Sequence, residues 1–259
     1  MCPPFYIAAV ANDQTVVNPA AGRRISSLVL SLGLLAPISA AAGAILANLR
    51  IVEPLSGFVG IFVGVLLAVV AVVMWIVALV LTRKGRNPSA RRRASIGVGL
   101  AVLYFAALVG LTLPTFDLPG INDITTDPTD PPEYVAIANL DANRGRDMSY
   151  DASFESQQRA GYPALAPKIL DRDVLDAFVM TDRAISGLPK VEIIASVPEE
   201  GRIEATVESG IFHFVDDIVV RVKEHPRGAI IDIRSKSRDG KGDLGANAAR
   251  IGAVFLALR

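Results

Sequence analysis

The chain has 259 residues, of which 51% are hydrophobic and 20% are charged, and its mean hydropathy is +0.42. This composition excludes an ordinary soluble protein, in which about 25% of residues are charged. The formal net charge of zero joins two unlike halves: from Asp117 onward there are 17 basic and 24 acidic residues, a net charge of −7, whereas only Asp13 and Glu53 are acidic before it. The acidic second half argues against nucleic acid as a partner. Cys2 is the only cysteine, which excludes an intramolecular disulfide.

Three long uncharged stretches occupy the first half of the chain. They lie at residues 25–49, 54–82 and 94–116 and cover 25, 29 and 23 positions. A helix needs about 20 apolar residues to cross a hydrocarbon core of about 30 Å. The sequence therefore predicts a three-helix transmembrane region over residues 25–116. The core spans are expected at residues 28–47, 57–81 and 95–113.

The basic residues predict the orientation of these helices. The connection at residues 83–93 has six cations and no acid, and the tail of residues 1–24 ends in two arginines. The other short connection has only Arg50 against Glu53. Because cytoplasmic connections retain the excess of Lys and Arg, we expect the tail and the basic connection in the cytoplasm. Three crossings then place the chain from residue 117 onward outside the cytoplasm, and the lipid bilayer is the first expected partner.

The predicted spans contain no Asp, Glu, Lys, Arg or His side chain. Transporters generally need such groups at membrane depth, so transport through the spans is the least favoured function. Gly57, Gly60 and Gly64 fall along one side of the second span, and the last two have the small-xxx-small spacing that lets helices approach closely. These glycines predict helix packing, either within one chain or in a homo-oligomer.

Residues 117–165 are expected to form an extended, acidic and Pro-rich linker that leads into the outer domain. The segment is rich in Pro, Asp, Asn and Gly and has no helical periodicity. Asp123, Thr125, Thr126 and Asp127 concentrate side chains that bond their own backbone in turns. An aspartate pair of this kind can also bind a cation, but converging ligands are missing, so we favour turns and predict no metal site.

The outer domain proper is predicted at residues 166–259. Val174, Phe178, Thr181 and Ile185 recur at helical spacing and predict an amphipathic helix. Asp171 or Asp173 can cap its N-terminus and Gly187 can end it. A second helix is predicted at the end of the chain, behind Asp243 as N-cap. Its apolar positions are Leu244, Ala248, Ile251, Phe255 and Leu258.

Between these helices the periodicity changes to two, which predicts half-buried strands. The alternating stretches lie around residues 191–193, 203–207, 218–222 and 231–233, after an extended stretch near 166–170. The turn-like segments 198–201 and 224–228 are short enough for antiparallel hairpins. The predicted architecture is three transmembrane α-helices followed by an α+β domain, with an antiparallel sheet of about four to five strands and two helices on one face.

Four stretches of the outer domain resemble the domain-of-unknown-function family 1499. They are NDITTDP from Asn122, IEATVES from Ile203, FVDDIVV from Phe214 and DIRSKSRDGKGDLGANAARI from Asp232. The resemblance covers nearly all of residues 122–258, and the last stretch is long enough to be specific. It implies a bacterial envelope protein, with relatives in plastids, in which the domain often follows membrane spans. It implies no established reaction, ligand or partner. Combined with the charge pattern, it predicts a multi-pass protein of the bacterial inner membrane with a periplasmic domain.

The densest polar cluster in the outer domain is the candidate site. Its residues are Asp232, Arg234, Ser235, Ser237, Arg238, Asp243, Asn247 and Arg250. One interpretation is a common patch at the last strand-to-helix junction, where the three arginines clamp a phosphate or carboxylate. The other, which we favour, is that these side chains cap the helix and pair with Asp216, Asp217 and Asp232.

Nucleophilic catalysis and cofactor binding have little support in the sequence. His213 and His225 are the only histidines, and neither belongs to a motif that places a base beside Ser235 or Ser237. Asp216 and Asp217 point to opposite sides of a strand, so they do not form a carboxylate pair. We predict no cofactor. The favoured function is a non-catalytic binding or scaffolding module for an envelope protein, lipid or small anion; the alternative is a hydrolase or transferase acting on an envelope lipid or glycan.

Overall fold

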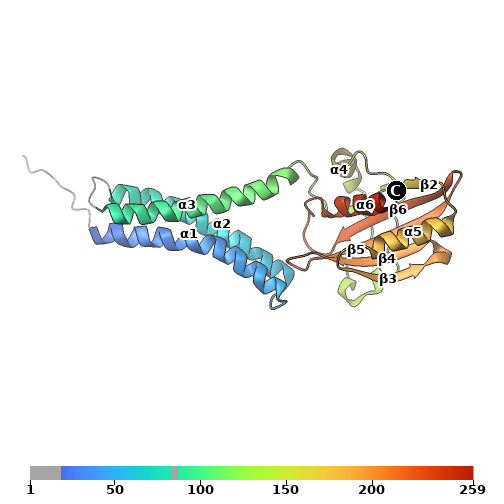
Figure 1. Cartoon of the computed structure of the whole chain (residues 1–259), viewed down its shortest axis with the longest axis horizontal. Coiled ribbons are helices and arrows are strands. Elements are labelled where there is room, and N and C mark those ends of the chain that lie inside the picture. Colours follow the sequence, from blue (N-terminus) through green and yellow to red (C-terminus); the bar gives the residue numbers. More distant parts are fainter. Residues whose placement is uncertain (1–18, 83–86, 259) are drawn as a thin grey trace, which may run out of the picture. The chain divides into compact units, whose positions relative to one another are not determined.

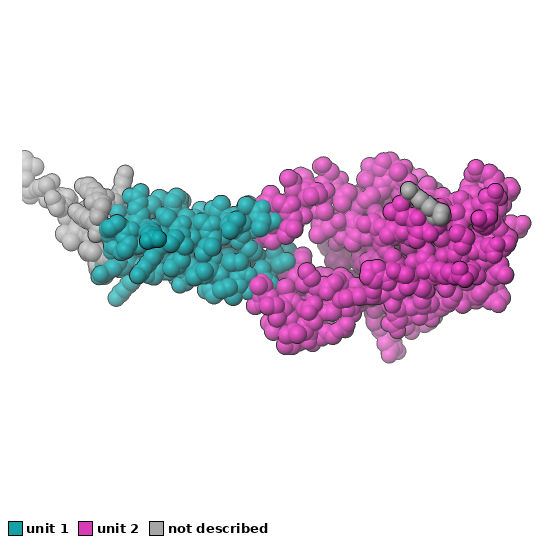
Figure 2. Space-filling view, viewed as in Figure 1, with its two compact units in different colours: residues 1–40, 61–107 teal, residues 41–60, 108–259 magenta. Residues whose placement is uncertain are grey.

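The computed structural model describes residues 19–82 and 87–258. The chain divides into two compact units, Met1–Ala40 with Ile61–Ala107 and Ala41–Gly60 with Leu108–Arg259 (Figure 2). Cys2 and the positions 83–86 of the basic connection lie outside the described residues.

The three predicted membrane helices are confirmed. Each is long and apolar enough to cross a membrane, with mean hydropathy of 2.1, 3.1 and 2.3 in chain order. Large apolar side chains along all three are exposed, as a lipid solvent requires. The chain is therefore a multi-pass membrane protein. The helices are α1 (Pro19–Asn48), which continues through Pro37, α2 (Pro54–Leu81) and α3 (Pro88–Thr112) (Figure 1).

Glycines bring the helices of the first unit into close contact. A Cβ atom on Gly33 would lie 2.0 Å from the carbonyl oxygen of Gly97, and one on Gly97 would lie 2.4 Å from that of Val29. Tyr104 donates a hydrogen bond of 2.9 Å to the backbone carbonyl of Ile61. Only glycine fits where backbones approach so closely, so the packing of α1 against α3 depends on Gly33 and Gly97.

The predicted Gly57, Gly60 and Gly64 surface packs within the chain. A Cβ on Gly57 would lie 2.5 Å from the Cβ of Ala47, and one on Gly43 would lie 3.2 Å from the Cα of Gly60. A Cβ on Gly64 would lie 2.6 Å from the Tyr104 hydroxyl. These contacts account for the spacing of the three glycines, while a homo-oligomer through them stays a prediction.

The outer domain contains a six-stranded antiparallel sheet. The strand order is β1-β6-β5-β4-β3. β2 pairs with the same edge of β6 as β1 does, but at Ala229–Ile231, whereas β1 pairs at Arg234–Lys236. The two predicted hairpins are confirmed, since β3 pairs with β4 and β5 pairs with β6 across short turns. The strands are β1 (Asp123–Thr125), β2 (Lys168–Leu170), β3 (Val191–Val197), β4 (Arg202–Glu208), β5 (Val215–His225) and β6 (Gly228–Ser237).

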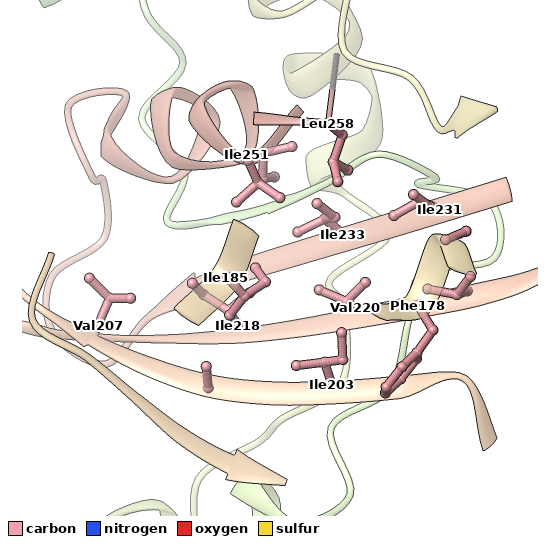
Figure 3. Close-up of a cluster of buried hydrophobic side chains, with 14 of the residues drawn as sticks. Phe178, Ile185, Ile203, Val207, Ile218, Val220, Ile231, Ile233, Ile251 and Leu258 are labelled. Atoms are coloured by element: carbon pink, nitrogen blue, oxygen red, sulfur yellow. The ribbon is translucent and has the colours of Figure 1, made fainter. Parts of the chain in front are cut away.

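Two helices cover one side of the sheet, which we call the helix face. In α5 (Val174–Ser186) the Asp173 carboxylate accepts a hydrogen bond from the Asp176 backbone N–H at 2.9 Å, as the capping pattern predicts. The apolar positions of α5 and of α6 (Ala246–Ala257) meet the alternate residues of β4, β5 and β6 in one core. Figure 3 shows that core, with Phe178, Ile185, Ile203, Val207, Ile218, Val220, Ile231, Ile233, Ile251 and Leu258.

The last helix begins later than predicted. Asp243 accepts hydrogen bonds from the backbone N–H groups of Gly245 and Asn247 at 2.9 and 2.8 Å, and Gly245 has a φ of 86°. Leu244, expected in the apolar stripe of the helix, lies in this turn and is 60% exposed. The aspartate bonds the chain two residues further on, so the turn takes the place of a first helical turn.

The other side of the sheet, which we call the covered face, lies under residues 118–150. This segment, expected as part of a linker, supplies β1 and packs on the sheet through Tyr134 and Ile137, which contact Val219. A further helix, α4 (Phe154–Gly161), places Gln158 against β1, where its amide exchanges hydrogen bonds of 2.9 and 2.7 Å with the backbone of Thr125. The central strands are therefore buried on both faces, where the sequence predicted half-buried strands.

Candidate functional site

The sheet divides the predicted polar patch in two. Alternation along β6 sends Ser235 and Ser237 to the helix face and Asp232 and Arg234 to the covered face. Arg238 follows the strand and also pairs on the covered face. The candidate residues therefore form two separate networks rather than one common site.

On the helix face, the polar residues bond one another beneath α6. The Ser235 hydroxyl donates to the Asn247 side-chain oxygen at 2.6 Å, and the Asn247 amide donates to the Ser237 hydroxyl at 3.0 Å. Arg250 donates to Asn247 at 2.7 Å and to Ser235 at 3.0 Å, and it pairs with the Asp216 carboxylate. Every candidate side chain here is thus used in holding α6 to β5 and β6.

On the covered face, Arg234 lies at the centre of a buried cluster. Its guanidinium donates to both oxygens of the Asp123 carboxylate, at 2.9 and 2.7 Å, and the two side chains are 1% and 0% exposed. Two backbone carbonyls, of Pro132 and Met148, accept further hydrogen bonds at 3.2 and 3.0 Å. Burial alone would lower the pKa of Arg234, but the bonds to Asp123 outweigh it and raise the pKa above its ordinary value, so the group is charged.

Two tyrosines from the covering segment complete this cluster. The guanidinium carbon of Arg234 lies 4.8 Å from the ring centre of Tyr134 and 5.6 Å from that of Tyr150. Burial, and then the charge of Asp123, raises the pKa of Tyr150 to about 12, so its phenol stays neutral. Lys236 bonds the same carboxylate at 3.1 Å. The cluster fixes the segment to the sheet through cation–π and charge-assisted contacts.

Arg238 is held in the same way a short distance along the face. Its guanidinium donates to the two carboxylate oxygens of Asp217 at 2.7 and 3.1 Å, and Asp217 is 1% exposed. Asn143 donates to Asp217 at 3.1 Å, and the Tyr134 hydroxyl donates to the Asp217 backbone carbonyl at 2.9 Å. Of the three carboxylates that the favoured interpretation named as partners, Asp216 and Asp217 are thus the partners of Arg250 and Arg238, whereas Asp232 pairs with Arg221.

Glu204 belongs to the covered face and was missed by the sequence analysis. Its buried carboxylate accepts hydrogen bonds from the backbone N–H groups of Val135, Ala136 and Ile137 at 3.1, 2.9 and 2.8 Å. Arg202 pairs with the same carboxylate. The strand alternation indicated only a polar position, because the three N–H donors are nearly seventy residues earlier in the chain.

Asp232 has the least complete set of partners. One oxygen bonds Arg221 at 3.1 Å, while the other is buried and has no hydrogen-bond partner within the described residues. Burial raises the pKa of Asp232 above its ordinary value. Arg221 also bonds Asp130 and lines a cleft of about 310 Å³ together with Pro131, Pro132, Glu133, Val135, Glu200, Arg202, Val219 and Val220.

Asp127 and Thr126, from the predicted turn segment, act in a turn and in strand pairing. Asp127 accepts hydrogen bonds from the backbone N–H groups of Thr129 and Asp130 at 3.0 and 3.2 Å, which is the predicted Asx turn. The Thr126 hydroxyl accepts from the Ile233 N–H at 3.0 Å. Over residues 19–82 and 87–258, no cluster of three or more His, Cys, Asp or Glu side chains is arranged to hold a metal ion.

Neither histidine lies beside the candidate serines. His213 contacts the Glu208 carboxylate and the Asn48 carbonyl, and His225 accepts a hydrogen bond from the Arg227 backbone N–H at 3.1 Å. The Ser235 hydroxyl is bonded to Asn247 and Arg250, and these two side chains cannot accept its proton as a general base does.

The outer domain matches a known protein family. A model for the family described as protein of unknown function (DUF1499) matches residues 123–258. The chain belongs to the DUF1499 family. The match begins at Asp123 and so includes both the covering segment and the sheet beneath it. No curated protein and no solved structure gives a significant match to the chain.

Proposed function

We propose that this DUF1499 protein is a membrane-anchored binding or scaffolding module without catalytic activity, whose folded domain lies outside the cytoplasm. The observation that carries the proposal is that the three arginines of the candidate patch are all paired with carboxylates: Arg234 with Asp123, Arg238 with Asp217 and Arg250 with Asp216. Each pair joins two elements of the fold. Their geometry supports a structural role for the patch.

The energetics of these pairs favour the same conclusion. A phosphate or carboxylate ligand would have to displace a carboxylate that is 0 to 8% exposed in each pair. Removing one partner from a buried ion pair costs ~3–5 kcal/mol, because the remaining charge stays desolvated. A small anion therefore competes poorly for these arginines, and we place partner binding on the exposed surface of the domain.

The placement outside the cytoplasm rests on charge and on the number of crossings. The basic connection at residues 83–93 has six cations, and the three membrane helices are followed by a domain segment of net charge −7. The positive-inside rule then assigns the basic connection and the N-terminal tail to the cytoplasm. In a bacterium this corresponds to an inner-membrane protein with a periplasmic domain.

One observation favours a second function, that of a hydrolase or transferase. The Asp232 carboxyl has a raised pKa and an unpartnered oxygen, and its partner Arg221 lines the cleft of about 310 Å³. A carboxyl whose pKa is raised by burial holds its proton to higher pH than an ordinary aspartate, as a general acid requires. The helix-face serines, however, lie on the opposite side of the sheet and cannot act with it.

The two functions are separated by purifying the full chain in detergent from bacterial membranes. We expect specific lipid or protein partners, identified by mass spectrometry, to co-purify equally with the parent chain and with a folded Arg250→Gln variant. We expect no turnover of radiolabelled envelope lipids or glycan fragments. Turnover by the parent chain that disappears in Arg250→Gln or Asp232→Asn, with the fold intact, would show that the domain is an enzyme.

A further inference from the structure

The loop between β4 and β5 is unusually apolar for an exposed hairpin connection. It runs from Ser209 to Phe214 and contains Ile211, Phe212 and Phe214. Ile211 is 58% exposed, although loops at hairpin ends normally carry polar and turn-forming residues. One exposed apolar side chain is ordinary by itself, whereas an apolar side chain that belongs to a contiguous apolar surface marks a site of interaction.

Within the second compact unit, this loop packs on the start of α2. The ring of Phe58 lies 5.3 Å from that of Phe212 and 5.7 Å from that of Phe214, both edge to face, and the two loop rings are 5.9 Å apart. Edge-to-face aromatic contacts of this kind add about 0.5–1.5 kcal/mol each beyond the area they bury. The loop is therefore fixed to a membrane helix through its aromatic residues.

Polar contacts hold the same loop to the connection between α1 and α2. Arg50 bonds the Glu208 carboxylate at 2.8 Å, and the Asn48 backbone carbonyl lies 3.0 Å from the Nε2 atom of His213. Within the outer domain, Lys190, which precedes β3, donates to the Gly210 carbonyl of the loop at 3.1 Å. Arg50, Lys190 and His213 are three of the four non-glycine residues with left-handed φ among the described residues. Such strained backbone persists only where surrounding contacts impose it.

The length of α2 gives the depth of this contact. Its 28 residues extend about 42 Å, which matches the ~40–45 Å of a bilayer including both headgroup layers. Phe58 lies four residues after the first residue of α2, about 6 Å along its axis, and so falls at the boundary between headgroups and hydrocarbon. Phe is among the side chains that interfacial segments bury at this boundary.

The exposed neighbours of the loop are apolar as well. Leu49, Ile51 and Leu55 at the end of the α1–α2 hairpin are 62%, 64% and 53% exposed, and the Asn48 side chain donates to the Ile211 carbonyl at 3.4 Å. Ile211 thus lies beside the exposed apolar connection that joins α1 to α2. Lipid is the occupant that fits, because this connection joins two membrane spans.

We propose that the Ser209–Phe214 loop of the outer domain contacts lipid, with Ile211 inserted into the interfacial layer of the bilayer beside the α1–α2 connection. The aromatic contacts with Phe58 and the Arg50–Glu208 pair keep the loop at that depth. The domain is then held against the membrane surface rather than carried free on its connecting segment.

Fluorescence quenching by brominated lipids tests this depth directly. Trp75 is the only tryptophan, so a Trp75→Phe background of the full chain in lipid nanodiscs can carry one new tryptophan at a time. We compare Ile211→Trp with Val59→Trp, which is 47% exposed on α2 next to Phe58, as the membrane reference and with Leu175→Trp, which is 60% exposed on α5, as the aqueous control. The expected result is quenching of Ile211→Trp comparable to Val59→Trp and at least severalfold stronger than Leu175→Trp.

Quenching of Ile211→Trp no stronger than that of Leu175→Trp would overturn the proposal, and so would a blue-shifted but unquenched emission, which would indicate burial against protein instead of lipid. If the tryptophan variant fails to fold, a nitroxide on Ile211→Cys in a Cys2→Ser chain gives the same information. It should be more accessible to oxygen than to a water-soluble nickel chelate, and the reverse order would contradict lipid contact.

Discussion

Replacing Asp123 with asparagine should unfold the outer domain at a much lower urea concentration. The substitution removes the charge that Arg234 and Lys236 share, at sites where Asp123 and Arg234 are 0% and 1% exposed. Arg234 keeps its bonds to the Pro132 and Met148 carbonyls, but its charge becomes uncompensated in the protein interior. Breaking a buried pair in this way costs ~3–5 kcal/mol, a large part of the stability of a typical domain.

Pulse proteolysis of the detergent-solubilised full chain in urea measures this loss without signal from the membrane helices. Asp141→Asn is the matched control, because Asp141 pairs with Arg144 at the surface and both side chains are more than 80% exposed. We expect a large decrease in the unfolding midpoint for Asp123→Asn and none for the control. Asp123→Asn combined with Arg234→Met should cost less than the sum of the two single variants. Equal midpoints for Asp123→Asn and Asp141→Asn would refute the idea that this pair fixes the covering segment.

Three further predictions concern other contacts. Gly97→Ala should lower the thermal stability of the membrane helices in detergent, because its Cβ would lie 2.4 Å from a backbone oxygen. Gly99→Ala, whose Cβ would have no atom within 4 Å, should leave that stability unchanged. Size-exclusion chromatography after heating compares the two variants, and equal loss of both would contradict the close approach. Glu204→Gln should destabilise the domain by ~1–3 kcal/mol in urea, because an amide cannot accept three backbone N–H bonds as a carboxylate does, and unchanged stability would contradict the capping role. Burial raises the folded-state pKa of Asp232, so its ionisation opposes folding as the pH rises above 3.8. The free energy of unfolding of Asp232→Asn should therefore match that of the parent at lower pH and exceed it increasingly toward neutrality. A difference between the two free energies that does not depend on pH would exclude the raised pKa.

Much of the fold followed from local patterns in the sequence. Uncharged length located three helices, and Asp173 and Gly187 marked both ends of α5. The alternation around Ile203 correctly indicated which residues of β4 face the apolar core under the helices. These signals are local, because they depend only on spacing along the chain.

The covered face could not be read in this way. Glu204 and Arg234 looked like solvent-facing strand positions, yet both are buried under residues 118–150. Asp123 looked like a turn residue, but its main partner is 111 positions away. Sequence spacing does not reveal such partners, and a segment rich in Pro and Asp resembles a linker whether or not it packs. The start of α6 was also misplaced at Leu244, because the Asp243 turn takes the place of a first helical turn.

The candidate patch was predicted by residue but not by arrangement. The favoured interpretation named Asp216, Asp217 and Asp232 as the partners of the cluster. The first two pair with Arg250 and Arg238, but Asp232 pairs with Arg221 and Arg234 pairs with Asp123. The clamp of three arginines assumed that Arg234 and Arg250 share a side of the sheet. Arg234 belongs to an even-numbered set of β6 that faces away from α6, so the two guanidiniums are separated by the sheet itself.

A pair of reporter fusions tests the central claim that three crossings carry the domain out of the cytoplasm. Each of two reporters is fused after Arg259 and, in a truncated control, after Arg93. Alkaline phosphatase is active only outside the cytoplasm. Green fluorescent protein fluoresces in the cytoplasm but not after export through the general secretion route. The account predicts phosphatase activity without fluorescence after Arg259 and the opposite after Arg93. Fluorescence without phosphatase activity after Arg259 would contradict it.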